Sequence, residues 1–326
     1  MKNRDNKFDF IKGILIILVV IGHAIQALYG IDNKEVWYNP IFNIVYTFHM
    51  PLFIFISGYF FSSSLKYSFS ILLEKKATRL LVPTFIWSTV ILLIWGTATE
   101  WQDVKPFKVY TIYKSYWYLI CIFVLTFTYY IIVKNKFIKL IILLIYIVSV
   151  IFYDYLPWPI FKDCQVIRQF AIFGLGILYQ SKWKNLMAQS KFYKYIFLAS
   201  DVFTIIGIRY FYGYNMMDFP PIIRIIDGIC CSMLVFIILS NSYNPIKNNK
   251  IINGFVYLGK NSLAIYLIHV VAFRFIIYSG YTFEYNLISA INLTTILIGT
   301  SLFLMFIIKS LLKEKSAMLI EIGGFT

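Results

Sequence analysis

Charged residues are scarce in this chain. They account for 14% of its 326 residues, against 60% hydrophobic and 20% aromatic residues, and the mean hydropathy is +0.74. An ordinary soluble domain carries about a quarter charged residues, so the composition excludes that class. It predicts a protein that crosses a membrane several times.

The sequence also lacks the alternation of apolar and polar residues that is typical of membrane strands. Its apolar runs instead approach the roughly 20 residues of a spanning helix, in which every backbone group is paired internally. We therefore predict an all-α polytopic membrane protein of about ten transmembrane helices, with a single domain over residues 1–326 and no appended soluble domain. The ten predicted segments are residues 8–29, 41–61, 80–95, 117–133, 137–153, 165–179, 192–211, 221–239, 255–278 and 285–312.

Acidic residues are half as frequent as basic ones, 15 against 30, which gives a formal net charge of +15. With ten helices, most of the basic residues fall at the termini and in the loops of one side. Because cytoplasmic loops collect Lys and Arg, both termini are predicted to be cytoplasmic, in a multi-pass protein of the cytoplasmic membrane. The charge fits contact with membrane lipid headgroups, and no nucleic acid is needed to explain it.

Cysteine is also rare. The four cysteines, Cys121, Cys164, Cys230 and Cys231, form neither a disulfide framework nor a metal-binding spacing. We interpret them as apolar filling of the helix packing.

Histidine occurs only three times, and each copy interrupts an apolar run: His23, His49 and His269. By residue count they lie about 9, 12 and 14 Å below the outer ends of their predicted helices. An ionisable group inside a membrane is costly and usually faces a cavity or a partner. A neutral imidazole can take a proton from a hydroxyl group, so all three are predicted to be catalytic, with His23 as the general base. A histidine that only hydrogen-bonds between helices is the alternative for each.

Zinc is the competing interpretation of three histidines. The sequence has no His-x-x-x-His pair and no obvious acidic residues to support such ligands. We therefore predict no metal site.

Basic residues mark the opposite, cytoplasmic ends of the predicted helices. Lys12 precedes His23 by eleven residues, which places both near one helix face about 16 Å apart. Asp9, one turn earlier, can pair with Lys12 or stabilise the helix N-terminus. Lys12 can also simply extend to the headgroups. Lys75, Lys76 and Arg79 form a cluster that can hold phosphate groups, although topology alone also favours positive charge there.

Six short motifs follow one another along the chain in the order found in a known family. They are "FDFIKGILIILVVIGH", "FHMPLFIFISGYF", "KKATRLLVPTFIW", "YWYL", "FGLGILY" and "LGKNSLAIYLIH". In these motifs the chain resembles, over essentially its whole length, the integral membrane acyltransferase 3 family, including polysaccharide O-acetyltransferases and fucose 4-O-acetylase-like proteins.

The resemblance implies transfer of an acyl group from cytoplasmic acyl-CoA, usually acetyl-CoA, to a hydroxyl of a carbohydrate or glycolipid acceptor. The family's essential first-helix histidine and its basic partner correspond to His23 and Lys12, so His23 is expected to act as general base or acyl carrier. A donor-associated pair of arginines corresponds to Lys76 and Arg79. Lysine lacks the planar fork of arginine, so two-point phosphate binding is expected at Arg79 and not at Lys76. The expected donor-binding residues are Lys12, Lys75, Lys76 and Arg79.

Polar and aromatic residues elsewhere are candidates for the acceptor site: Trp117, Tyr118, Arg224 and Asp227. A structural role is the alternative for each. A transporter or flippase for a lipid-linked or polymeric glycan is the alternative function, and it predicts helices broken at matching positions of an inverted repeat, which the sequence does not show.

Overall fold

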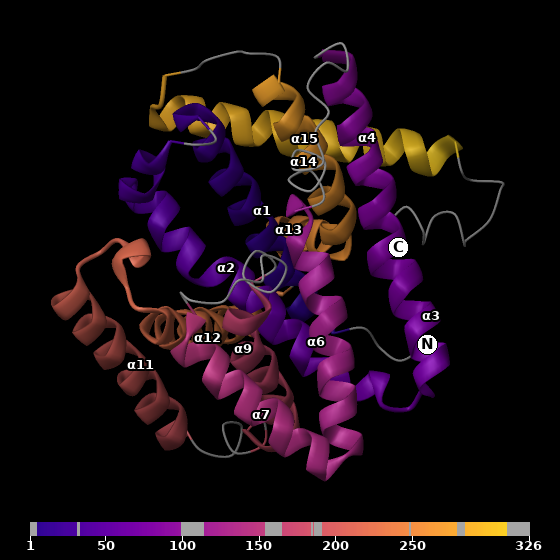
Figure 1. The fold of residues 1–326 in the computed structure, drawn as a ribbon. Helices are drawn as coiled ribbons and strands as arrows, with labels where there is room; N and C mark the ends of the chain where they lie inside the picture. Colours follow the sequence, from indigo (N-terminus) through magenta and orange to yellow (C-terminus); the bar gives the residue numbers. More distant parts are fainter. Residues whose placement is uncertain are drawn as a thin grey trace. The chain divides into compact units, whose positions relative to one another are not determined.

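The computed structural model describes residues 5–30, 33–98, 114–153, 165–183, 185, 191–247, 249–278 and 284–311. In these ranges all the regular elements are helical, and no strand is present (Figure 1). The all-α prediction is therefore confirmed. The main helices are α1 (Asn6–Tyr29), α2 (Pro40–Tyr59), α3 (Phe69–Lys76), α4 (Val82–Ala98), α6 (Trp117–Lys134), α7 (Lys136–Ile151), α9 (Val166–Leu178), α11 (Lys191–Tyr212), α12 (Pro221–Ile246), α13 (Lys250–Lys260), α14 (Ser262–Tyr278) and α15 (Leu287–Leu311).

The helices are long and apolar enough for a multi-pass membrane protein. Among the described residues, seven helices qualify as spans, or eight if the bent pair of α13 and α14 counts as one. Two further predicted segments correspond to α7 and α9, which have only 16 and 13 residues. The count of ten and the cytoplasmic position of both termini stay predictions.

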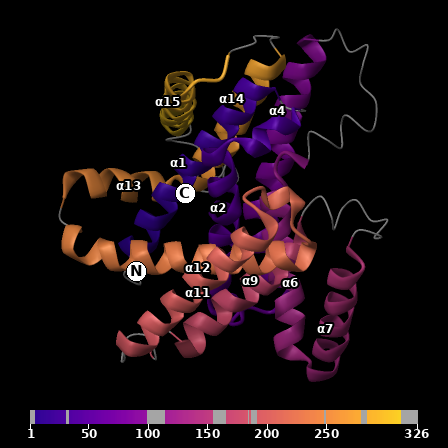
Figure 2. The same ribbon diagram turned by 90° about the vertical axis from the view of Figure 1, so that its left-hand side faces the viewer.

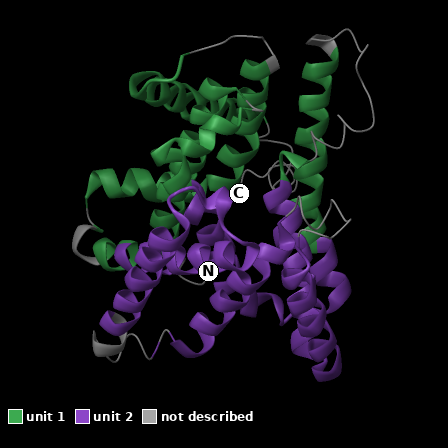
Figure 3. Cartoon of the chain, turned by 60° about the vertical axis from the view of Figure 1, so that its left-hand side comes forward, with its two compact units in different colours: residues 1–45, 75–116, 239–326 green, residues 46–74, 117–238 purple. Residues whose placement is uncertain are grey.

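Two compact units can be distinguished by their internal contacts (Figure 3). Unit 1 comprises residues 1–45, 75–116 and 239–326, and unit 2 comprises residues 46–74 and 117–238. In unit 2, α6 contacts both α7 and α9. The hydroxyl of Tyr129 on α6 donates to the carbonyl of Phe170 on α9 at 2.9 Å. That the whole chain forms one domain stays a prediction.

Unit 1 is organised around α1, which packs against α13, α14 and α15. The crossing of α1 and α13 depends on two glycines, Gly13 and Gly259. A Cβ atom at Gly259 would overlap the backbone carbonyl of Asp9, and one at Gly13 would overlap the carbonyl of Phe255. Small residues let the two backbones approach each other directly.

The ninth predicted segment is wrong as a single straight helix. It is two helices, α13 and α14, that meet at an angle of 73° (Figure 2). At the bend, the Asn261 side chain donates to the carbonyl of Tyr257 at 2.8 Å and accepts from Lys309 Nζ at 3.1 Å. An asparagine that competes for backbone groups in this way favours a helix end.

The third predicted segment, residues 80–95, is too short. The helical stretch begins at Phe69 and runs as one span to Gly96. α3 and α4 are joined by a π-helical turn, η3 (Ala77–Leu81). The N-terminal part of this stretch contains Glu74 and the neighbouring lysines. It is therefore not part of an apolar run, and the predicted segment begins too late.

Candidate functional site

Two of the three histidines meet in unit 1. His23 on α1 and His269 on α14 have ring centroids 5.3 Å apart. His23 is partly exposed, whereas His269 is completely buried. Phe273, one turn further along α14, lies 4.8 Å from the ring of His23. The site thus has one partly exposed imidazole, that of His23, packed against the buried imidazole of His269.

The hydrogen bonding of His269 fixes its tautomer. Its Nδ1 lies 2.8 Å from the carbonyl oxygen of Ile265. A carbonyl only accepts, so Nδ1 carries the hydrogen and, in the neutral ring, Nε2 keeps its lone pair. That Nε2 atom is buried, and no residue in the described ranges forms a hydrogen bond with it. The ring of His269, which packs beside His23, therefore has a nitrogen, Nε2, that can accept a proton.

The N-terminal part of α1 carries an ion pair. Lys12 Nζ lies 2.7 Å from Asp9 Oδ1, with 23% of the lysine side chain and 2% of the aspartate side chain exposed. The expected pairing is confirmed, while Asp5 is the residue that caps the helix through the amide of Lys7. A lysine ammonium has three N–H donors, and the pair with Asp9 Oδ1 uses one of them.

The basic cluster lies where α3 passes into the π-helical turn. Lys75 and Arg79 are exposed and Lys76 is half-buried. Neither Lys76 nor Arg79 forms an ion pair with a carboxylate in the part of the chain that the structure describes. Single π-helical turns are frequent at functional sites. The cluster therefore has cationic groups that are available to an anion.

The third histidine belongs to unit 2. His49 on α2 is buried, and its ring lies 4.8 Å from the ring of Tyr46. Trp117 and Tyr118 at the start of α6 are in edge-to-face contact at 6.3 Å. Tyr118 also packs 5.8 Å from Phe53. Catalysis by His49 and acceptor binding by Trp117 and Tyr118 stay predictions.

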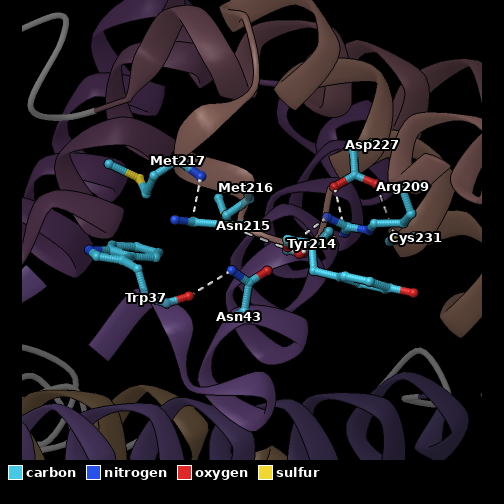
Figure 4. A network of polar contacts seen from close by, with 10 residues as sticks. Trp37, Asn43, Arg209, Tyr214, Asn215, Met216, Met217, Asp227 and Cys231 are labelled. Carbon is cyan, nitrogen blue, oxygen red and sulfur yellow. Dashed lines mark hydrogen bonds and ion pairs between the residues drawn. The ribbon is translucent and has the colours of Figure 1, made fainter. Parts of the chain in front are cut away.

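Arg224 and Asp227 are occupied by local contacts in unit 2. Arg224 donates to the backbone carbonyls of Phe219 and Met217, both at 2.7 Å. Asp227 is buried and pairs with Arg209 at 2.9 Å (Figure 4). A buried carboxylate needs such a partner. These contacts account for both side chains structurally, and their predicted role in acceptor binding stays a prediction.

Phe273 and the partner of Asp227 are two site residues that are not predicted from the sequence. Phe273 follows His269 by four residues, the spacing that places two side chains on one helix face. This spacing was a usable signal for a residue beside the histidine pair. Arg209 precedes Asp227 by eighteen residues and lies on another helix, and no sequence spacing points to that pairing.

Two curated proteins are similar in sequence to part of this chain. Nodulation protein NolL of Sinorhizobium fredii is 47% identical over 90 residues, which are 27% of this chain and 25% of that protein. Nodulation protein NolL of Mesorhizobium japonicum is 48% identical over 90 residues, 27% of this chain and 24% of the relative. The match thus spans about a quarter of these curated relatives. No solved structure matches the chain.

The family comparison covers far more. A family model described as an acyltransferase domain, that of the acyltransferase 3 family, matches residues 5–312. This range includes both histidines of the pair, the Asp9–Lys12 ion pair and the basic cluster of α3 and η3. The chain therefore belongs to the acyltransferase 3 family and is a membrane acyltransferase.

Proposed function

We propose that this acyltransferase moves an acyl group, in the simplest case acetyl, from cytoplasmic acyl-CoA to a hydroxyl of a cell-surface glycan or its lipid-linked precursor. The membrane in which it acts is the cytoplasmic membrane. The observation that carries the proposal is the accessible imidazole of His23 packed against the buried ring of His269. Acyl transfer to a hydroxyl needs a group that removes the hydroxyl proton, and a neutral imidazole does so near neutral pH.

In the direct route, His23 takes the proton of the acceptor hydroxyl while the oxygen attacks the thioester carbonyl. The tetrahedral intermediate then expels the CoA thiolate, and the imidazolium returns its proton to the thiolate. In the covalent route, the His23 nitrogen attacks the thioester first, the C–S bond breaks, and CoA leaves as thiolate from an acyl-imidazole. The acceptor hydroxyl then attacks the acyl-imidazole, its oxygen takes the acyl group, the imidazole leaves, and the hydroxyl proton neutralises the thiolate. Both routes form an ester and release CoA thiol, and both use the same imidazole.

The donor would bind through its phosphate groups. Lys76 and Arg79 have no carboxylate partner among the described residues, and Arg79 is exposed. Arginine matches a phosphate with two parallel hydrogen bonds, whereas lysine offers a point charge. We assign the main phosphate contact to Arg79, with Lys75 and Lys76 as further cations and Lys12 as a contributor whose direction is set by Asp9.

The acceptor would be recognised by aromatic side chains. Trp117 and Tyr118 present two rings in edge-to-face contact, and both side chains are partly exposed. Such rings suit stacking on the apolar face of a sugar. Arg224 and Asp227 are weaker candidates, because their polar atoms already have partners.

Replacing Arg79 by alanine tests donor binding. A lost charge-assisted hydrogen bond of about 1.5–3 kcal/mol raises the KM for acetyl-CoA roughly tenfold to a hundredfold, with kcat nearly unchanged. CoA release is measured at varied acetyl-CoA and fixed membrane glycolipid extract. Lys139→Ala, which removes an exposed cation from α7, is the control and should leave this KM unchanged. Lys76→Arg should lower the KM for acetyl-CoA, because the new arginine adds a second planar guanidinium group that can bind phosphate at two points. An unaltered KM for acetyl-CoA in Arg79→Ala would mean that the donor phosphates bind at another site.

The proposed function itself is tested with the purified full-length chain. Acetyl-CoA and membrane glycolipid extract should yield free CoA together with a new acetyl ester on a glycolipid, detected by mass spectrometry. No release and no ester would contradict the proposal. The glycan transporter would require helices broken at matching positions of two repeats, and the described residues contain one bent pair.

A further inference from the structure

Two residues that precede α6, Ser115 and Tyr116, lie across α14; we call them the Ser115–Tyr116 strap. The Tyr116 hydroxyl donates to the Leu267 carbonyl at 2.9 Å. The Tyr266 hydroxyl donates to the Ser115 carbonyl at 3.4 Å, and Arg274 Nη2 donates to the Ser115 hydroxyl at 2.8 Å. The strap is thus fastened to α14 at the adjacent residues Tyr266 and Leu267 and, about two turns further along, at Arg274.

The Tyr116 side chain is completely buried. A buried phenol costs free energy unless its hydroxyl is hydrogen-bonded. A carbonyl oxygen has two lone pairs, so the Leu267 carbonyl can accept from Tyr116 in addition to its helical partner. This hydrogen bond therefore fixes the height of the strap on α14, two residues before His269.

A series of ring contacts leads from the strap to the pair of His23 and His269. The rings of Tyr116 and Tyr266 are 6.0 Å apart, and Tyr266 lies 5.8 Å from His269. His269 in turn lies 5.3 Å from His23. All of these residues belong to unit 1. A shift of the strap therefore reaches His23 through two packed rings.

A second series of contacts joins the same two ends. The Arg274 guanidinium, which donates to Ser115, lies 5.9 Å from the ring centroid of Phe273. Phe273 contacts His23 at 4.8 Å. The strap is consequently connected to both rings that pack on His23, His269 and Phe273.

From this arrangement we propose that Tyr116 is a positioning residue of the acyl-transfer site. Its hydroxyl holds α14 at the height at which His269 and Phe273 fix the ring of His23. The inference rests on the proposed function of His23. A base misplaced by about 1 Å loses up to roughly a hundredfold in rate, so a single distant hydrogen bond can have a measurable effect on turnover.

The test is Tyr116→Phe, which removes the hydroxyl and keeps the ring. We expect kcat for CoA release to fall about tenfold while the KM for acetyl-CoA stays within about twofold of the wild-type value. Tyr129→Phe is the matched control, since it removes a hydroxyl that donates to a helix carbonyl at the same 2.9 Å in unit 2. Its kcat should equal that of the wild type. Thermal unfolding of both variants is measured alongside.

An unchanged kcat in Tyr116→Phe would overturn the inference, as would equal losses of kcat in both variants. If Tyr116→Phe does not fold, Ser115→Ala replaces it, because this change removes the hydroxyl that accepts from Arg274. It should also lower kcat without changing the KM for acetyl-CoA. Wild-type protein that releases no CoA overturns the proposed function and this inference together. Wild-type release with unaltered strap variants overturns the inference alone.

Discussion

Replacing His23 by alanine is expected to reduce CoA release about a thousandfold, the usual contribution of a general base. The buried ring of His269 does not compensate, because it is completely enclosed and its Nδ1 is held by the Ile265 carbonyl. Acetyl-CoA binding should remain, since the phosphate contacts are assigned to Arg79 and its neighbours. The loss should therefore appear in kcat with an unchanged dissociation constant for the donor.

Calorimetric titration with acetyl-CoA and CoA-release kinetics separate these two quantities. Gln26→Ala is the control, because Gln26 is also partly exposed and lies one turn further along α1. Its rate should stay within about threefold of wild type, the effect of an ordinary surface change. His23→Ala with more than about a tenth of the wild-type rate would contradict a role as base or acyl carrier. Loss of donor binding in the same variant would instead place His23 in the donor site.

The fold class could be predicted because hydrophobic run length is a local property. The bend at Asn261 was not predicted, because the apolar stretch continues beyond it to residue 278. The missed start of α3 has a different cause. Its residues from Phe69 onward include Glu74 and two lysines, so the uninterrupted apolar run of this segment begins only at Leu80.

The candidate site also has features that could be predicted from the sequence and features that could not. The common face of Lys12 and His23, and the pair of Asp9 with Lys12, follow from helix periodicity alone. The contact between His23 and His269 depends on how α14 packs against α1, which no spacing in the sequence specifies. By residue count the three histidines lie at similar depths in their predicted helices, and the structure brings His23 and His269 together in unit 1.

Replacing Gly259 by alanine is expected to have the largest effect on folding. The added Cβ would overlap the Asp9 carbonyl oxygen, a backbone atom that no side-chain rotation can move away. Overpacking of this kind costs about 1–3 kcal/mol and occasionally more, and we expect the upper end because the Cβ atom has no rotational freedom and the atom that it meets is backbone. The midpoint of thermal unfolding should fall clearly below that of the wild type.

The same helix provides the control. Gly254 on α13 is exposed, and a Cβ atom there would meet nothing within 4 Å. Gly254→Ala should therefore stabilise the protein slightly, by up to about 1 kcal/mol, because alanine has the higher helix propensity. If Gly259→Ala and Gly254→Ala unfold at the same temperature, α1 and α13 do not approach each other as closely as the structure shows.

If Lys12 contributes to donor binding as proposed, the α1–α13 crossing also connects stability to donor binding. Asp9 contributes its backbone carbonyl to the contact with Gly259 and its side chain to the pair with Lys12. A Gly259→Ala protein that still folds should therefore displace Lys12 and raise the KM for acetyl-CoA, which Gly254→Ala leaves unchanged. Gly13→Ala perturbs the same crossing from the other helix, so the two changes should be non-additive in their effect on unfolding. Additive effects would mean that the two glycines act at independent contacts.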